Sequence, residues 1–220
     1  MMEDVISKIL RKTNAPSIVQ ELNGIIEQEH QKRLSFYDWV EDNHKAEFIN
    51  GKIIIHSPAS KKHLEISELL SCILGYYVRK NNLGRCYTEK AMIALSRNDY
   101  EPDIVFFSND KLVDLDADAV LFPAPDFVVE ILSKSTKKTD RTIKKEDYAL
   151  HHIKEYWIID PDKRLIEQYL LLNEMDTIYF EPYIYRMGDE IKSKVIKGFE
   201  IPVDAIFDYQ SNMDAMKKMV

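Results

Sequence analysis

Two short apolar runs, with Asp103 in the first and Glu130 in the second, most constrain how this chain folds. The first run is Glu-Pro-Asp-Ile-Val-Phe-Phe at 101–107, and the second is Pro-Asp-Phe-Val-Val-Glu-Ile-Leu at 125–132. Runs that are apolar on both faces are typical of buried strands in a central sheet. An isolated carboxylate in such a strand costs several kcal/mol or more. A cation between Asp103 and Glu130 would offset that cost, and carboxylates around a hard divalent ion indicate metal-assisted phosphodiester hydrolysis.

The composition is that of an ordinary globular protein, with 45% hydrophobic and 30% charged residues among 220. A chain of this length most often forms one domain with a sizeable core. No run of about 18 apolar residues is present, so we expect no membrane span, and the start lacks the features of a signal peptide. The cysteines, Cys72 and Cys86, are too few for a disulfide framework, and we expect Cys72 to be a small core residue. These features favour a cytoplasmic location.

The net charge of -7 argues against a protein that coats nucleic acid through its overall charge. A local basic patch is sufficient for a nuclease, and one is present after the second acidic run. It consists of Lys134, Lys137, Lys138, Arg141, Lys144 and Lys145, with a smaller pair at Lys61 and Lys62. Phosphate contact and a simple solvated surface remain equally good interpretations for each of these residues.

The spacing of apolar residues predicts alternating helices and strands. Residues 1–34 have helical spacing with a break at Asn14, and Ser35 has the form of a capping residue that opens a separate short helix. Asn50-Gly51 predicts a hairpin over 45–55, and a helix is predicted over 63–77. Further strands are predicted at 85–95, 102–107, 126–132, 155–160, 164–172, 177–185 and 190–197. We expect a mixed α/β (α+β) domain over 35–220, with one central mixed sheet flanked by helices, and an N-terminal helical arm over 1–34.

A helix predicted from about Asp140 to His152 follows the second acidic run. Asp140, Lys144, Tyr148 and His152 are four residues apart and form one polar ridge on it. Such a ridge can lean over the end of the Glu130 strand and bring Lys144 to the acids, where it would orient an attacking water or offset transition-state charge. The alternative is that Asp140 and Lys144 form only a surface ion pair.

The block from Pro125 to Pro161 has a specific pattern. It contains PDFVVEILS-x-ST, then the spaced Asp140, Lys144 and Tyr148, then EYWIIDP. Shorter matching pieces are EFING at 47–51, His63, EPDIVF at 101–106 and GFEIPV at 198–203. Over roughly 35–208 the chain resembles the Uma-type ("Uma two") family of restriction endonucleases, within the PD-(D/E)XK nuclease superfamily. The arm at 1–34 lies outside the resemblance.

This resemblance implies a restriction-endonuclease-like fold and a set of site residues. Asp103 and Glu130 would bind Mg²⁺ or Mn²⁺, and Glu47 would be an additional acid near the metal. The superfamily's lysine normally lies two residues after the second acid, where this chain has Leu132. In the family a helix lysine replaces it, which corresponds to Lys144. Lys134 and Lys145 are the competing candidates, and Lys145 points about 100° away around the helix.

The function predicted from the sequence is metal-dependent endonucleolytic hydrolysis of DNA. Asp103, Glu130, Glu47 and Lys144 are the predicted catalytic residues, and His63 and Tyr148 are candidate accessory residues. Lys134, Lys137, Lys138 and Arg141 are the candidate DNA contacts. One alternative is a non-catalytic module of the same fold that binds nucleic acid or protein. A third hypothesis is that the arm makes the chain chiefly an oligomerisation or regulatory subunit. A homodimer is one assembly that the arm could form.

Overall fold

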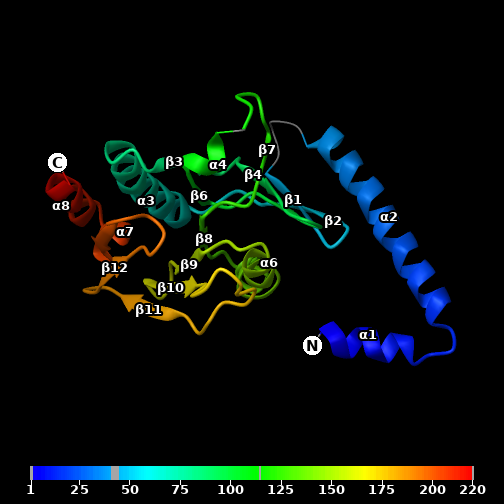
Figure 1. Cartoon of the computed structure of the whole chain (residues 1–220). Helices are drawn as coiled ribbons and strands as arrows, with labels where there is room; N and C mark the ends of the chain where they lie inside the picture. The colour runs from blue at the N-terminus through cyan, green and yellow to red at the C-terminus, as the bar shows by residue number, and fades with distance from the viewer. Residues whose placement is uncertain (1, 41–44, 114, 220) are drawn as a thin grey trace.

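The computed structural model describes residues 2–40, 45–113 and 115–219, without the side chains of residues 2 and 3. Its body is built on a six-stranded sheet in the order β11-β10-β9-β8-β6-β3 (Figure 1). These strands are β3 (Gly84–Thr88), β6 (Ile104–Ser108), β8 (Phe127–Ile131), β9 (Glu155–Asp160), β10 (Leu165–Leu170) and β11 (Tyr183–Arg186). The β8–β9 pair is parallel and the others are antiparallel. The expected mixed sheet is therefore present.

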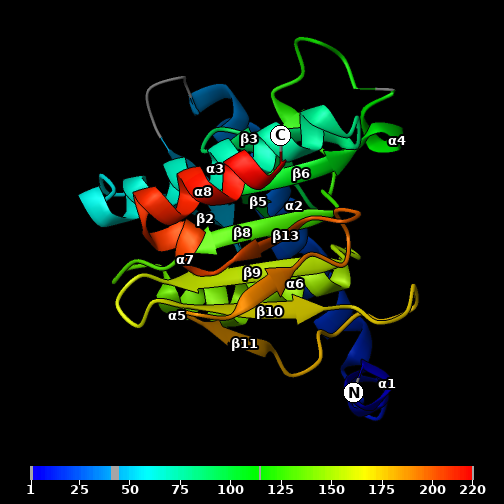
Figure 2. The same ribbon diagram turned by 90° about the vertical axis from the view of Figure 1, so that its left-hand side faces the viewer.

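Helices cover both faces of this sheet, as Figure 2 shows. On one face lie α3 (Lys61–Lys80), α7 (Asp204–Phe207) and α8 (Tyr209–Met219), and their apolar side chains pack on Ile104, Phe127 and Val129. On the other face, the segment that follows β8 packs on Val105 and Val128. Because successive strand residues point to opposite faces, Asp103 and Glu130 belong to this second face. The alternation thus decides which helix meets the two acids.

A second sheet of five short strands lies beside the first, in the order β2-β1-β5-β4-β7. Its strands are β1 (Ala46–Ile49), β2 (Lys52–Ile55), β4 (Met92–Ala94), β5 (Asp99–Tyr100) and β7 (Leu121–Phe122). The predicted hairpin joins β1 and β2, and positive φ angles of 51° at Asn50 and 75° at Gly51 allow its tight turn. Smaller elements beside the two sheets are the short helix α4 (Asn109–Leu112) and a two-stranded sheet of β12 (Glu190–Lys192) and β13 (Glu200–Pro202).

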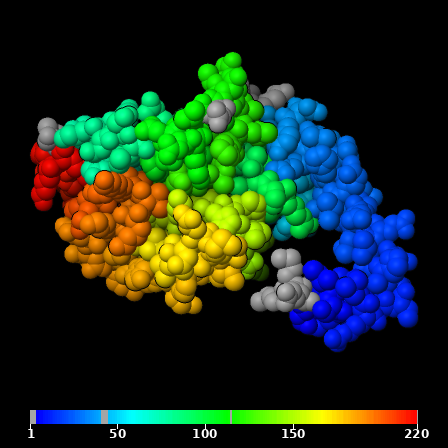
Figure 3. All heavy atoms as spheres, viewed as in Figure 1, coloured from blue at the N-terminus to red at the C-terminus, as the bar shows by residue number. Residues whose placement is uncertain are grey.

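The N-terminal segment forms two helices, α1 (Met2–Leu10) and α2 (Ala15–Trp39), which project from the body (Figures 1 and 3). The break at Asn14 is confirmed, whereas the separate short helix at Ser35 is wrong, because α2 continues through that residue. Buried Phe36 lies one residue further on and anchors the helix end in an apolar cluster with Phe48. Arg33 adds a bidentate contact to the buried Asp99 at 2.6 and 2.7 Å.

The segment after Glu130 is less regular than its sequence indicates. It consists of α5 (Lys137–Thr139), a π-helical turn over Asp140–Lys144, and α6 (Lys145–Leu150). His152 is not on the helix, since α6 ends at Leu150 and His152 has a positive φ of 56°.

Cys72 is exposed, so its expected place in the core is also wrong. None of the helices described here is long and apolar enough to cross a membrane.

Candidate metal centre and active site

The pairing of β6 with β8 brings Asp103 and Glu130 together. Ile104 pairs with Val129, so one further step of the same antiparallel register sets Asp103 opposite Glu130. Residues that are directly opposite share a face and have Cβ atoms about 4.5–5.5 Å apart. The N–H of Ile131 donates to Oδ2 of Asp103 at 2.8 Å and ties the two strand ends to each other. The two acids identified in the apolar runs therefore belong to one site.

Glu130 receives two side chains from the segment that follows its own strand. Lys144 Nζ donates to Glu130 Oε1 at 2.8 Å, and the Tyr148 hydroxyl donates to the same oxygen at 2.9 Å. Lys144 ends the π-helical turn and Tyr148 lies one turn later on α6, so the predicted ridge does face Glu130. Lys145 points elsewhere, with its ammonium 5.3 Å from the centre of the Tyr169 ring. Of the helix lysines considered, Lys144 is the one that reaches the acids.

Lys144 is enclosed by carboxylates. Its ammonium lies 2.8 Å from Glu47 Oε1, 2.8 Å from Glu130 Oε1 and 3.6 Å from Asp140 Oδ1, and its side chain is only 2% exposed. The alternative of a surface ion pair between Asp140 and Lys144 is wrong, because both are buried. If all three acids are ionised, they carry two more negative charges than Lys144 balances.

This charge excess appears in the pKa values of the cluster. Burial is the largest effect on Glu130, and the nearby charges of Asp140, Asp103 and Glu47 add to it, so the pKa of Glu130 is raised despite Lys144. Burial likewise raises the pKa of Asp140. The pKa of Glu47 is instead lowered, because Lys144 and His56 outweigh its burial. The cluster thus holds more carboxylate charge than its own lysine stabilises.

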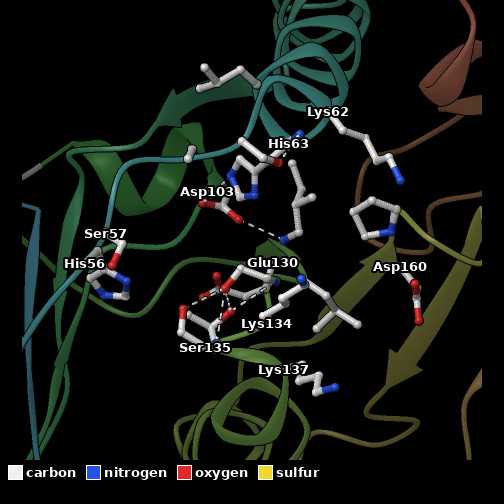
Figure 4. A pocket seen from close by; sticks show the side chains of 18 of the residues that line it. His56, Ser57, Lys62, His63, Asp103, Glu130, Lys134, Ser135, Lys137 and Asp160 are labelled. Carbon is white, nitrogen blue, oxygen red and sulfur yellow. Dashed lines mark hydrogen bonds and ion pairs between the residues drawn. The ribbon is translucent and has the colours of Figure 1, made fainter.

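Asp103 has a separate set of partners on the side away from Lys144. Lys45 Nζ lies 2.9 Å from Asp103 Oδ1 and 2.9 Å from Glu89 Oε2, and His63 Nε2 lies 3.3 Å from the same Asp103 oxygen. Burial opposes ionisation of Asp103, but the hydrogen bond from His63 and the charge of Lys45 outweigh it and lower its pKa. The predicted accessory residue His63 therefore contacts an acid of the site directly (Figure 4).

A cavity of about 1060 Å³ opens in front of both groups. Asp103, Glu130 and Lys144 contribute to its wall, and Figure 4 shows Asp103 and Glu130 within it. Basic side chains line it as well: Lys62, Lys134, Lys137, Arg141 and Lys163. Lys138 is exposed but does not line the cavity. Arg141 is held by an ion pair with Glu167, so its guanidinium is already engaged.

Three residues of the site have no place in the sequence prediction: Lys45, Glu89 and His56. Lys45 and Glu47 are two residues apart at the start of β1, and this alternation is a signal that could have placed both on one face. His56 Nε2 lies 3.1 Å from Glu47 Oε2 directly after the hairpin. Glu89 follows β3 in a loop at positive φ, and no local pattern indicates it.

The donor set fits a hard divalent ion. Asp103, Glu130 and Glu47 offer carboxylate oxygens, which are the ligands that Mg²⁺ and Mn²⁺ prefer. Both oxygens of buried Asp140 also lack a hydrogen-bond partner among the described residues. A cation of charge two would balance the excess around Lys144. The donor type and the charge excess suit such an ion, whereas the described acids and histidines whose ligand atoms already lie within 4.8 Å of one another are His63, Glu89 and Asp103.

Comparison with a solved structure establishes the class of fold. The chain is similar to a crystal structure described as a "putative nuclease belonging to DUF820" from Anabaena variabilis ATCC 29413, with a TM-score of 0.67 and 21% identity over 78% of this chain and 94% of that one. The mixed α/β architecture is therefore that of a nuclease-like fold. A family model, Uma2, described as "Putative restriction endonuclease", matches residues 33–204. The chain belongs to this family, which confirms the resemblance seen in its sequence. No curated protein matches the chain.

Proposed function

We propose that this protein is a metal-dependent endonuclease that hydrolyses DNA phosphodiester bonds. The observation that carries the proposal is that Asp103 and Glu130 line one basic-lined cavity, and that Glu130 shares a buried lysine with the buried Glu47, with excess negative charge around that lysine. A divalent ion supplies charge neutralisation of the scissile phosphate and lowers the pKa of a bound water. Membership of a family described as restriction endonucleases supports the same activity.

The residues of the site have different roles in this proposal. Asp103 and Glu130 hold the ion, and Glu47 contributes from β1. Lys144 fixes the orientation of Glu130 and Glu47, and through them the attacking water, because its ammonium contacts both carboxylates at 2.8 Å. Tyr148 donates to Glu130 and limits its rotation. Lys134 and Lys137 lie at the cavity wall, where they would contact the phosphates of bound DNA.

Nicking of supercoiled plasmid DNA in Mg²⁺ or Mn²⁺ tests the proposal. We expect Asp103→Asn and Glu130→Gln each to lower the rate by at least about a hundredfold, because each removes a metal ligand. Asp162→Asn is the matched control, since Asp162 lines the same cavity but is 84% exposed and pairs with Lys62 rather than with the acids of the site. Circular dichroism checks that each variant is folded.

Two results would contradict the proposal. Wild-type rates in both Asp103→Asn and Glu130→Gln would show that these acids do not carry the reaction. DNA binding by the wild-type protein without cleavage in either metal would identify the non-catalytic binding module instead. A parallel reaction with single-stranded RNA of matched length determines the preference between DNA and RNA.

A further inference from the structure

A second group of metal-ligating side chains includes Asp103 but not Glu130. His63, Glu89 and Asp103 come from α3, the loop after β3 and the residue before β6. Each offers one ligand atom, and these three atoms lie within 4.8 Å of one another. Oxygen ligands lie about 2.0–2.6 Å from a divalent ion, so two ligands of one ion are at most about 4–5 Å apart. The three side chains are therefore close enough to share an ion.

A cation already lies between two of these ligands. The Lys45 ammonium is 2.9 Å from both Asp103 and Glu89, and it bridges the same carboxylates that an ion would bridge. At these distances the ammonium makes charge-assisted hydrogen bonds with both carboxylates. Moreover, Oε1 of Glu89 is a buried oxygen without a hydrogen-bond partner among the described residues. The space between Asp103 and Glu89 thus favours a cation, and Oε1 of Glu89 is an additional oxygen that Lys45 does not contact.

Lys45 also has room to leave. Its side chain is 24% exposed and lines the large cavity, whereas Lys144 is 2% exposed and contacts three acids. Figure 4 shows His63 and Asp103 directed toward each other at the cavity wall. A long flexible lysine at a cavity mouth exchanges its contacts for water at small cost. An ion that enters the cavity therefore meets a position whose occupant can be displaced.

We propose that His63, Glu89 and Asp103 form a second divalent-cation site, and that Lys45 holds its cation position until a divalent ion displaces it. The proposal rests on the proposed function for the role of Asp103, which the two sites share. On exchange, the ammonium moves into the cavity, and His63 releases to solvent any proton on the nitrogen that binds the ion. The imidazole ligand favours Mn²⁺ and later first-row ions over Mg²⁺.

Calorimetric titration of the intact protein with Mn²⁺ tests this site. We expect His63→Gln and Glu89→Gln each to weaken binding at the second site at least about tenfold, since each removes one of three ligands. Lys45→Met removes the competing cation, and we expect it to tighten binding about five- to tenfold. Lys45→Arg keeps a positive charge and should bind no more tightly than wild type.

Lys62→Met is the matched control for loss of a positive charge. Lys62 lines the same cavity but pairs with Asp162 rather than with the proposed ligands. Its replacement should change Mn²⁺ affinity less than about twofold, because exposed charges are screened. Electron spin echo measurements on bound Mn²⁺ should detect a directly coordinated imidazole nitrogen in wild type and in Lys45→Met, and none in His63→Gln. Thermal unfolding verifies that each variant is folded.

The possible failures are distinguishable. Unchanged isotherms for His63→Gln and Glu89→Gln would overturn the second site, and an affinity of Lys45→Met that only equals that of Lys62→Met would overturn the role of Lys45. If Glu130→Gln loses binding and nicking while Glu89→Gln keeps both, the proposed function stands and this inference is wrong. If Glu130→Gln keeps both and Glu89→Gln loses Mn²⁺, the second site stands and the first assignment of ligands is wrong.

Discussion

Two lysines in this protein bridge pairs of carboxylates at almost the same distances, yet their surroundings differ. Lys144 contacts Glu47 and Glu130 at 2.8 Å with its side chain only 2% exposed. Lys45 contacts Glu89 and Asp103 at 2.9 Å with its side chain 24% exposed. A buried ammonium cannot leave without exposing uncompensated charge, whereas a partly exposed one can be replaced by water or another cation. The same ion-pair geometry therefore serves as a fixed support in one place and an exchangeable contact in the other.

The acids that contact the two lysines also differ in the direction of their pKa shifts. The pKa of Glu130 is raised, since burial and three neighbouring acids outweigh Lys144. The pKa of Asp103 is lowered, since His63, Lys45 and the Ile131 N–H outweigh its burial. The surroundings of Asp103 thus favour its ionised form, whereas those of Glu130 disfavour it. Additional positive charge near Glu130 would therefore stabilise its ionised form.

The largest expected loss in the free energy of unfolding comes from replacing Lys144. Replacing it by Met leaves Glu47, Glu130 and Asp140 buried without their shared cation, and breaking a buried ion pair in this way costs about 3–5 kcal/mol. Urea unfolding followed by circular dichroism measures the change in the free energy of unfolding. A loss below about 1 kcal/mol would show that the cluster is not held by this lysine.

A smaller change in the free energy of unfolding is expected when one of the uncompensated acids is neutralised in the Lys144→Met variant. Glu130→Gln added to Lys144→Met removes one uncompensated carboxylate, so the double variant should recover about 1–3 kcal/mol relative to Lys144→Met alone. The same urea titrations on wild type, both single variants and the double variant give the coupling energy. Simple additivity of the two losses would refute an electrostatic link between these residues.

The smallest expected loss in the free energy of unfolding comes from replacing Lys45. Lys45→Met should lower the free energy of unfolding by about 1 kcal/mol, because Asp103 keeps the Ile131 N–H and His63 as partners and the site is open to water. Thermal and urea unfolding beside Lys144→Met test the contrast directly. Equal losses in the two variants would remove the distinction between a fixed and an exchangeable lysine.

Much of the fold follows from local patterns in the sequence. The Asn50-Gly51 turn, the buried runs that became β6 and β8, and the helical spacing of α3 are all found where the sequence indicates. The start of a short helix at Ser35 was misleading, because a capping motif competes with the continuation of α2 and with the burial of Phe36. The π-helical turn at Asp140–Lys144 was also not indicated, since contacts with β1 and β8 decide it.

The candidate site divides in the same way. Asp103, Glu130 and Lys144 were identified from an acid inside an apolar run and from a four-residue ridge, which are patterns of neighbouring residues. Lys45 and Glu89 are 44 residues apart and meet only because two sheets converge beside Asp103. The division of the chain at residue 34 remains a prediction, although the family match begins nearby at residue 33.

The sequence by itself determined that two acids had to be buried in neighbouring strands and that a lysine-bearing helix followed them, because periodicity and desolvation act on residues close in the chain. Only the tertiary structure decided how each charge is compensated. Lys144 is buried among acids from remote segments, whereas Lys45 is partly exposed beside its acids. These differences depend on how remote segments pack together, and no local sequence pattern indicates them.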